Sequence, residues 1–97
     1  MWTVRLKAAA RKQVERLPEK VNKSFKALLA DLQTYGPVLP SWPNFAKLKQ
    51  HRDCYHCHLK KARPTYVAVW QVIERQTWLN EVRYVGVHES ADYRRVC

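Results

Sequence analysis

Residues 54–59, Cys-Tyr-His-Cys-His-Leu, and the apolar run 66–73, Tyr-Val-Ala-Val-Trp-Gln-Val-Ile, decide the fold of this chain. Successive side chains of an extended strand point to opposite faces of a sheet. In the first stretch, the even-numbered side chains are expected on a wet face that carries imidazole and cationic groups, and the odd-numbered ones in a core. The even-numbered set is Cys54, His56, His58 and Lys60. The second stretch is apolar at both parities, which is typical of a central strand buried on both faces.

The segments around these two stretches predict the other elements. Residues 2–6 alternate between apolar and polar, which indicates a short strand. A helix is expected to begin at residue 8, and Pro18 suits the first turn of a second helix. Five apolar residues of this second helix have the spacing of one helical face. They are Val21, Phe25, Leu28, Leu29 and Leu32. Gly36 and Pro37 are stop signals that end it.

The order of elements predicts a two-layer α+β domain that spans residues 1–97. It comprises an N-terminal strand, a helical hairpin and an antiparallel three-stranded meander, with all strands in one sheet and the hairpin on one face. The strands of the meander are expected at 54–60, 65–73 and 79–87. A short strand is expected within 45–49, and a short helix or extended arm within 88–95.

The charge of the chain favours a polyanionic partner. Lys and Arg number 18 against 8 Asp and Glu, for a formal charge of +10, and such asymmetry is typical of nucleic-acid binding. An acidic protein partner is the alternative explanation. No apolar run approaches the about 20 residues that cross a bilayer, so no membrane contact is expected. Three cysteines imply no complete disulfide framework, which favours a reducing cytoplasm.

The Cys54-x-x-Cys57 spacing raises the question of a metal site. Structural zinc needs about four converging ligands, whereas these two side chains point to opposite faces of the predicted strand. No second pair of this kind follows, and Cys57 is more simply a core residue. We therefore expect neither a metal ion nor a small-molecule cofactor.

The histidines indicate acid–base chemistry. Imidazole titrates near neutral pH and can take up and return a proton. His56 and His58 lie side by side on one predicted strand, and His88, at the end of the last strand, can meet them across the sheet. Cations that can bind a phosphodiester flank them in the sequence. They are Lys47, Lys49, Lys60, Lys61 and Arg63. The alternative is that these side chains are ordinary solvated residues of a strand.

The acidic residues argue against a metal-dependent nuclease, because two-metal phosphoryl transfer requires convergent carboxylates and those of this chain are scattered. Metal-free cleavage uses the 2′-hydroxyl of the substrate as nucleophile, so the expected substrate is RNA. Aromatic side chains stack on unpaired bases. Tyr93, in a polar tail, is the aromatic residue most expected outside the core.

The order of elements resembles the RelE/ParE toxin superfamily, as do residues 53–60, 66–72 and 84–89 and the position of Tyr93. The resemblance covers nearly the whole chain and implies a small type II toxin that cleaves mRNA on the ribosome and is neutralised by a cognate antitoxin. RelE has lysines where this chain has His56 and His58, an arginine at Val67 and another near His88. The histidines, with Gly86-Val87-His88, are more similar to the YafQ and HigB branches.

The resemblance implies catalytic roles for His56, His58, His88 and Tyr93, with Lys60 or Arg63 replacing the missing arginine. Two other functions stay open from the sequence. The ParE branch shares the fold but inhibits gyrase without cutting RNA, and a plain RNA-binding module needs no catalytic histidine.

Overall fold

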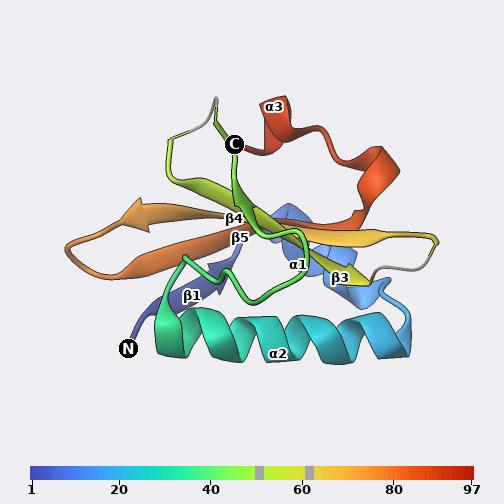
Figure 1. The fold of residues 1–97 in the computed structure, drawn as a ribbon, viewed down its shortest axis with the longest axis horizontal. Coiled ribbons are helices and arrows are strands. Elements are labelled where there is room, and N and C mark those ends of the chain that lie inside the picture. Colours follow the sequence, from blue (N-terminus) through green and yellow to red (C-terminus); the bar gives the residue numbers. More distant parts are fainter. Residues whose placement is uncertain (50–51, 61–62) are drawn as a thin grey trace.

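The computed structural model describes residues 1–49, 52–60 and 63–97. The helices and strands follow one another in the predicted order, including the short strand before the meander and the short helix after it (Figure 1). They are β1 (Thr3–Leu6), α1 (Ala8–Glu15), α2 (Glu19–Tyr35), β2 (Ala46–Lys47), β3 (Cys54–Lys60), β4 (Tyr66–Glu74), β5 (Leu79–Val87), the 3₁₀ turn η1 (His88–Ser90) and α3 (Tyr93–Val96).

All the strands form one mixed sheet in the order β1-β5-β4-β3-β2. β1 pairs with β5 in parallel, and the remaining neighbours are antiparallel. β4 lies at the centre of this order and is buried over most of its length, as its apolar side chains at both parities predicted. The expected meander is confirmed, and β1 and β2 extend it at its two edges.

The helical hairpin covers one face of the sheet, which we call the helix face. Figure 1 shows α2 lying along this face. Its predicted apolar stripe is confirmed, because Val21, Phe25, Leu28 and Leu32 are buried and Leu29, partly buried, packs against them. They pack with residues of β3, β4 and β5, among them Tyr55, Cys57, Leu59, Ala68, Trp70, Val82 and Val85. α1 contacts β5.

Both ends of α2 follow from local sequence. Pro18 is the N-cap, directly before the helix rather than inside its first turn as predicted. Gly36 ends the helix at a φ of 88°, a backbone conformation that glycine adopts without steric cost. A Cβ at Gly36 would also lie only 2.6 Å from Nε1 of Trp2. Glycine therefore both ends the helix and lets Trp2 pack against it.

The opposite face of the sheet, which we call the histidine face, carries η1 and α3. Figure 1 shows α3 on the side of the sheet away from α2. A disulfide joins Cys54 of β3 to Cys97, directly after α3. Cys57 stays free, so the cysteines form no complete framework, but the odd count gave no sign of this one pair. The expectation that Cys54 lies on a wet face was wrong, because the returning segment buries it fully. Among the described helices, none is long and apolar enough to cross a membrane.

Candidate active site

Four aromatic rings form a continuous row on the histidine face. The ring of His56 lies 6.2 Å from that of His58, and the ring of His58 lies 5.6 Å from that of His88. At the other end of the row, the Tyr93 ring lies 5.5 Å from the His56 ring. The structure thus brings together all four side chains that the sequence singled out for catalysis.

The backbone explains why these rings meet. His56 and His58 alternate with core residues along β3, opposite Val69 and Val67 of β4. His88 follows β5, and its backbone N–H donates to the carbonyl of Thr65 at 2.8 Å. The chain then turns back across the sheet, which places Tyr93 over the far end of the row. Two segments that are distant in sequence therefore build one site.

His56 is the most shielded of the three imidazoles. Its Nδ1 is buried and has no hydrogen-bond partner among the described residues. Burial lowers the pKa of His56, and the nearby His58 and His88 lower it further because they repel a second positive charge. The pKa of His58 is also lowered, first by burial and then by His88. Both imidazoles of β3 are thereby biased toward the neutral form, which accepts a proton.

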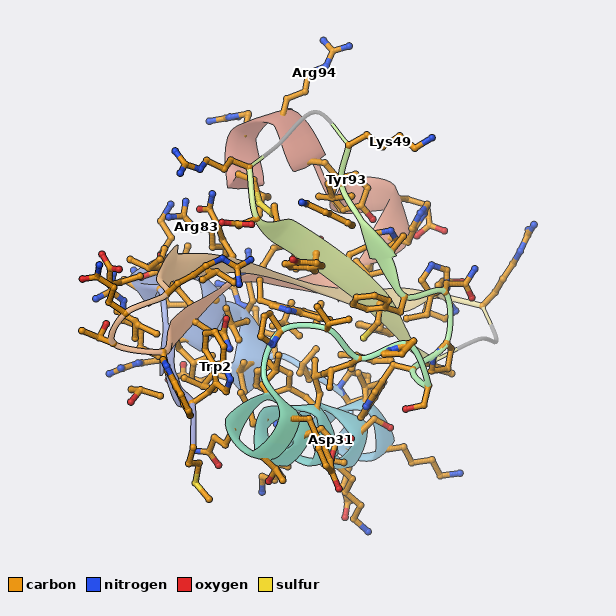
Figure 2. The ribbon with its side chains drawn as sticks, turned by 60° about the vertical axis from the view of Figure 1, so that its left-hand side comes forward. Trp2, Asp31, Lys49, Arg83, Tyr93 and Arg94 are labelled. Carbon is orange, nitrogen blue, oxygen red and sulfur yellow. A yellow bond between two sulfur atoms is a disulfide. The ribbon has the colours of Figure 1, made fainter. Side chains whose placement is uncertain are left out.

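Tyr93 lies outside the core, as its polar surroundings in the sequence predicted, but its side chain is partly covered. Figure 2 shows its side chain between α3 and the sheet. Its hydroxyl is buried, again without a hydrogen-bond partner in the described part of the chain, and burial raises its pKa. The sequence did not indicate this cover, because the contact between the rings of Tyr93 and His56 joins positions far apart in the chain.

The predicted phosphate-binding cations divide between the two faces of the sheet. Lys49 is exposed and lies on the side that carries Tyr93 (Figure 2). Arg63 is exposed in the β3–β4 connection, two residues before the Thr65 carbonyl that binds His88. Lys61 lies outside the described residues.

Two of these cations do not join the histidines. The pairing of β3 with β4 shifts between His58 and Lys60, so Lys60 lies opposite Tyr66, which packs on the core. Lys60 instead lines a hollow beside Lys20 and Ser24 of α2. The expectation that it shares a face with His58 was wrong, because a β-bulge breaks the alternation.

The side chain of Lys47 also lies on the helix face. It pairs with Tyr55, whose ring is in the core, and directly opposite residues of neighbouring strands point to the same side. Its predicted place beside the histidines was therefore wrong as well, because the register of β2 could not be read from a strand of only two residues at a sheet edge.

Three arginines near the row were not predicted. Arg94 and Arg95 are exposed on α3 next to Tyr93, and Figure 2 shows Arg94 pointing away from the sheet. Arg83 of β5 pairs with Glu81 at 3.2 Å and donates to the carbonyl of Val96 at 3.3 Å. The adjacent Arg94 and Arg95 beside Tyr93 were a visible signal in the sequence, whereas the contact of Arg83 was not.

This arrangement can move protons. The row offers three imidazoles at different depths, from the half-buried His56 to the exposed His88, beside an excess of positive charge. Within the part of the chain that the structure describes, no three His, Cys, Asp or Glu side chains are grouped so as to hold a metal ion. General acid–base catalysis on an anionic substrate is the chemistry that groups of these types can supply.

Solved structures of toxins have the same fold. The isolated E. coli RelE toxin is 23% identical, covers 98% of this chain and 93% of its own, and superposes with a TM-score of 0.71. RelE in the archaeal RelE–RelB complex from Pyrococcus horikoshii is 18% identical, with coverages of 93% and 98% and a TM-score of 0.73. A metal-bound toxin from Helicobacter pylori is 21% identical, with coverages of 95% and 100% and a TM-score of 0.72. No protein-family model and no curated protein matches the sequence. The chain therefore has the RelE-like toxin fold.

Proposed function

We propose that this chain is the toxin of a type II toxin–antitoxin system and that it cleaves messenger RNA on the ribosome without a metal ion. The observation that carries the proposal is the row formed by His56, His58, His88 and Tyr93 on the histidine face. The RelE-like fold supports the toxin assignment. The formal charge of +10 supports an RNA substrate, because neutralising phosphates dominates the affinity for nucleic acid.

The different burial of the imidazoles suggests which acts as the base and which as the acid. His56, whose pKa is lowered by burial and by its neighbours, takes a proton from the 2′-hydroxyl of the RNA. The resulting 2′-oxygen attacks the adjacent phosphorus, and the 5′-oxygen leaves with a proton from the exposed His88. The products are a 2′,3′-cyclic phosphate and a 5′-hydroxyl end.

The remaining groups bind and orient the substrate. His58 lies between the proposed base and acid, within reach of the phosphate that they flank. Lys49 and Arg63 are the predicted cations best placed to offset the charge that grows on the phosphate oxygens. Tyr93 stacks on a base or orients the reacting nucleotide. An antitoxin with an acidic segment is the expected protein partner, and it would bind the histidine face.

The test is a His88→Ala variant compared with the wild type. His88 is exposed, so its loss should change the free energy of unfolding by less than about 0.5 kcal/mol. We expect the variant to lose growth inhibition and the new mRNA 5′ ends that appear shortly after induction of the wild type. Thermal unfolding of both proteins controls for folding.

Three outcomes would contradict the proposal. A folded His88→Ala variant that still arrests growth and cleaves mRNA would refute the role of the imidazole. Accumulation of cleaved DNA with intact mRNA would indicate a gyrase inhibitor instead. Tight RNA binding without growth arrest or cleavage would indicate a binding module.

A further inference from the structure

The disulfide between Cys54 and Cys97 ties α3 to the strand that carries His56. The Cα atoms of the two cysteines lie 6.4 Å apart, within the range of about 4.4–6.8 Å that disulfides span. Cys54 is fully buried at the start of β3, two residues before His56, whereas Cys97 is only partly buried. One covalent bond therefore holds the segment 93–97 against the histidine row.

The tied segment shields two groups that the proposed reaction uses. Nδ1 of His56 and the hydroxyl of Tyr93 are both buried, and neither has a hydrogen-bond partner in the described ranges. Burying a polar group without a partner is unfavourable. In the closed arrangement these two groups make no hydrogen bond with the described residues. Water or RNA could bond to them once the segment moved away.

The noncovalent contacts of this segment are few. α3 contains four residues, and isolated helices shorter than about 12 residues are marginal in water. Asp92 caps it by accepting from the backbone N–H of Arg94 at 3.1 Å. Arg83 donates to the carbonyl of Val96 at 3.3 Å. The position of the segment therefore depends strongly on whether the disulfide is formed.

We propose that Cys54 and Cys97 are a redox latch, in which the disulfide holds Tyr93 over His56 and closes the site, and reduction lets the segment 93–97 open to admit RNA. The inference rests on the proposed function, since it regulates the same site. The class of modifier is a small thiol with its disulfide, such as the glutathione couple.

The exchange balances as two substitutions at sulfur. The thiolate of one small thiol attacks the more exposed sulfur, that of Cys97, and displaces the Cys54 thiolate, which takes up a proton. A second small thiol then attacks the mixed disulfide, releases the Cys97 thiol and leaves as the oxidised small disulfide. Two electrons pass from the two small thiols to the protein, and the reverse reaction closes the latch.

Cys57 provides a matched control within the same strand. It is a free cysteine in the core, and burial raises the pKa of its thiol to about 12. Thiol exchange requires an accessible thiolate, so Cys57 should take no part. Cys57→Ser must therefore retain any redox response that belongs to the latch.

The test uses the full chain equilibrated with oxidised or reduced glutathione, freed of glutathione and treated with diethylpyrocarbonate. Mass spectrometry gives the labelling rate of His56, with His58 as internal reference. We expect His56 of the oxidised protein to react at least about tenfold more slowly, equivalent to about 1.4 kcal/mol of additional closing free energy. Cys97→Ser should label at the reduced rate in both conditions, and Cys57→Ser should behave as the wild type. Cleavage of ribosome-bound mRNA should slow by a similar factor on oxidation.

Equal labelling of His56 in both states would overturn the latch, as would a redox response that survives Cys97→Ser. If labelling depends on redox state but neither form cleaves RNA, the latch stands and the proposed function fails. If His88-dependent cleavage is identical in both states, the function stands and the latch fails.

Discussion

Replacing Arg83 with Met should loosen the C-terminal segment while leaving the sheet folded. The guanidinium donates to the Val96 carbonyl at 3.3 Å and pairs with Glu81 at 3.2 Å. Its side chain is 22% exposed, and that of Glu81 is 11% exposed. Methionine retains an unbranched apolar side chain but removes both polar contacts.

The size of the effect follows from the surroundings of each contact. Hydrogen bonds to charged groups contribute about 1.5–3 kcal/mol when buried, whereas exposed ion pairs contribute about 0–1 kcal/mol. Glu81 retains Arg5, whose Nε lies 2.7 Å from its other oxygen, so no buried charge is left unpaired. We expect Arg83→Met to lower the free energy of unfolding by about 2 kcal/mol in total. The share from Val96, about 1 kcal/mol, should increase opening of the segment about fivefold.

Two measurements separate the global from the local effect. Urea unfolding reports the total loss, and hydrogen exchange at the amides of Arg95 and Val96, which bond to the Asp92 carbonyl, reports local opening. Both use reduced protein, so that the disulfide does not mask the change. Arg75→Met is the matched control, because Arg75 is 57% exposed and its ion pair with Asp53 lies near the surface. An equal cost in both variants, or unchanged exchange in Arg83→Met, would refute the reasoning.

Three further predictions concern single side chains. The pKa of His56 is lowered in the folded state, so the unfolded chain binds more protons, and the free energy of unfolding should fall as pH drops below about 6.5. His56→Gln should flatten this pH dependence, measured by urea titrations. An unchanged slope would contradict the prediction. The side-chain amide of Asn80 is fully buried and has no hydrogen-bond partner among the described residues. Asn80→Val should therefore raise the free energy of unfolding by about 1–3 kcal/mol. A lower melting temperature would count against this. Lys49→Ala should weaken RNA binding and its salt dependence. Lys26 is exposed on α2, so Lys26→Ala should change neither. Equal losses of affinity in a binding titration would disprove the assignment of the two lysines to different faces.

The sequence predicted the sheet well, because apolar patterns record burial directly. The predicted strands 54–60 and 79–87 match β3 and β5, and the stripe on α2 identifies its buried side. Alternation also placed His56 and His58 on one face. It failed at Lys60, because a bulge after His58 moves the side chains that follow it to the opposite face. The residue types around the bulge do not indicate it.

The contacts of the C-terminal segment could not be predicted for a different reason. Cys54 and Cys97 are separated by 43 positions, and nothing in the polar residues around Tyr93 shows that its ring lies on an imidazole. Such contacts arise only when the chain after β5 turns back, which no local pattern encodes. The resemblance to a toxin family implied a role for Tyr93 but did not indicate that its hydroxyl is buried.

The site is built by the return of one segment over the sheet, and this links closure of the site to its chemistry. His56 and His58 belong to β3, whereas His88 and Tyr93 lie on the chain after β5. That chain is fixed at its start by the bond from His88 to Thr65 and near its end by Arg83 and Cys54. Loosening the end should expose His56 and also raise its pKa, because burial is the main cause of the lowering. If the proposed function holds, release of the segment admits substrate and makes the proposed base stronger in the same step. Loss of the His88 anchor would then separate the proposed acid from the row and stop the proposed reaction.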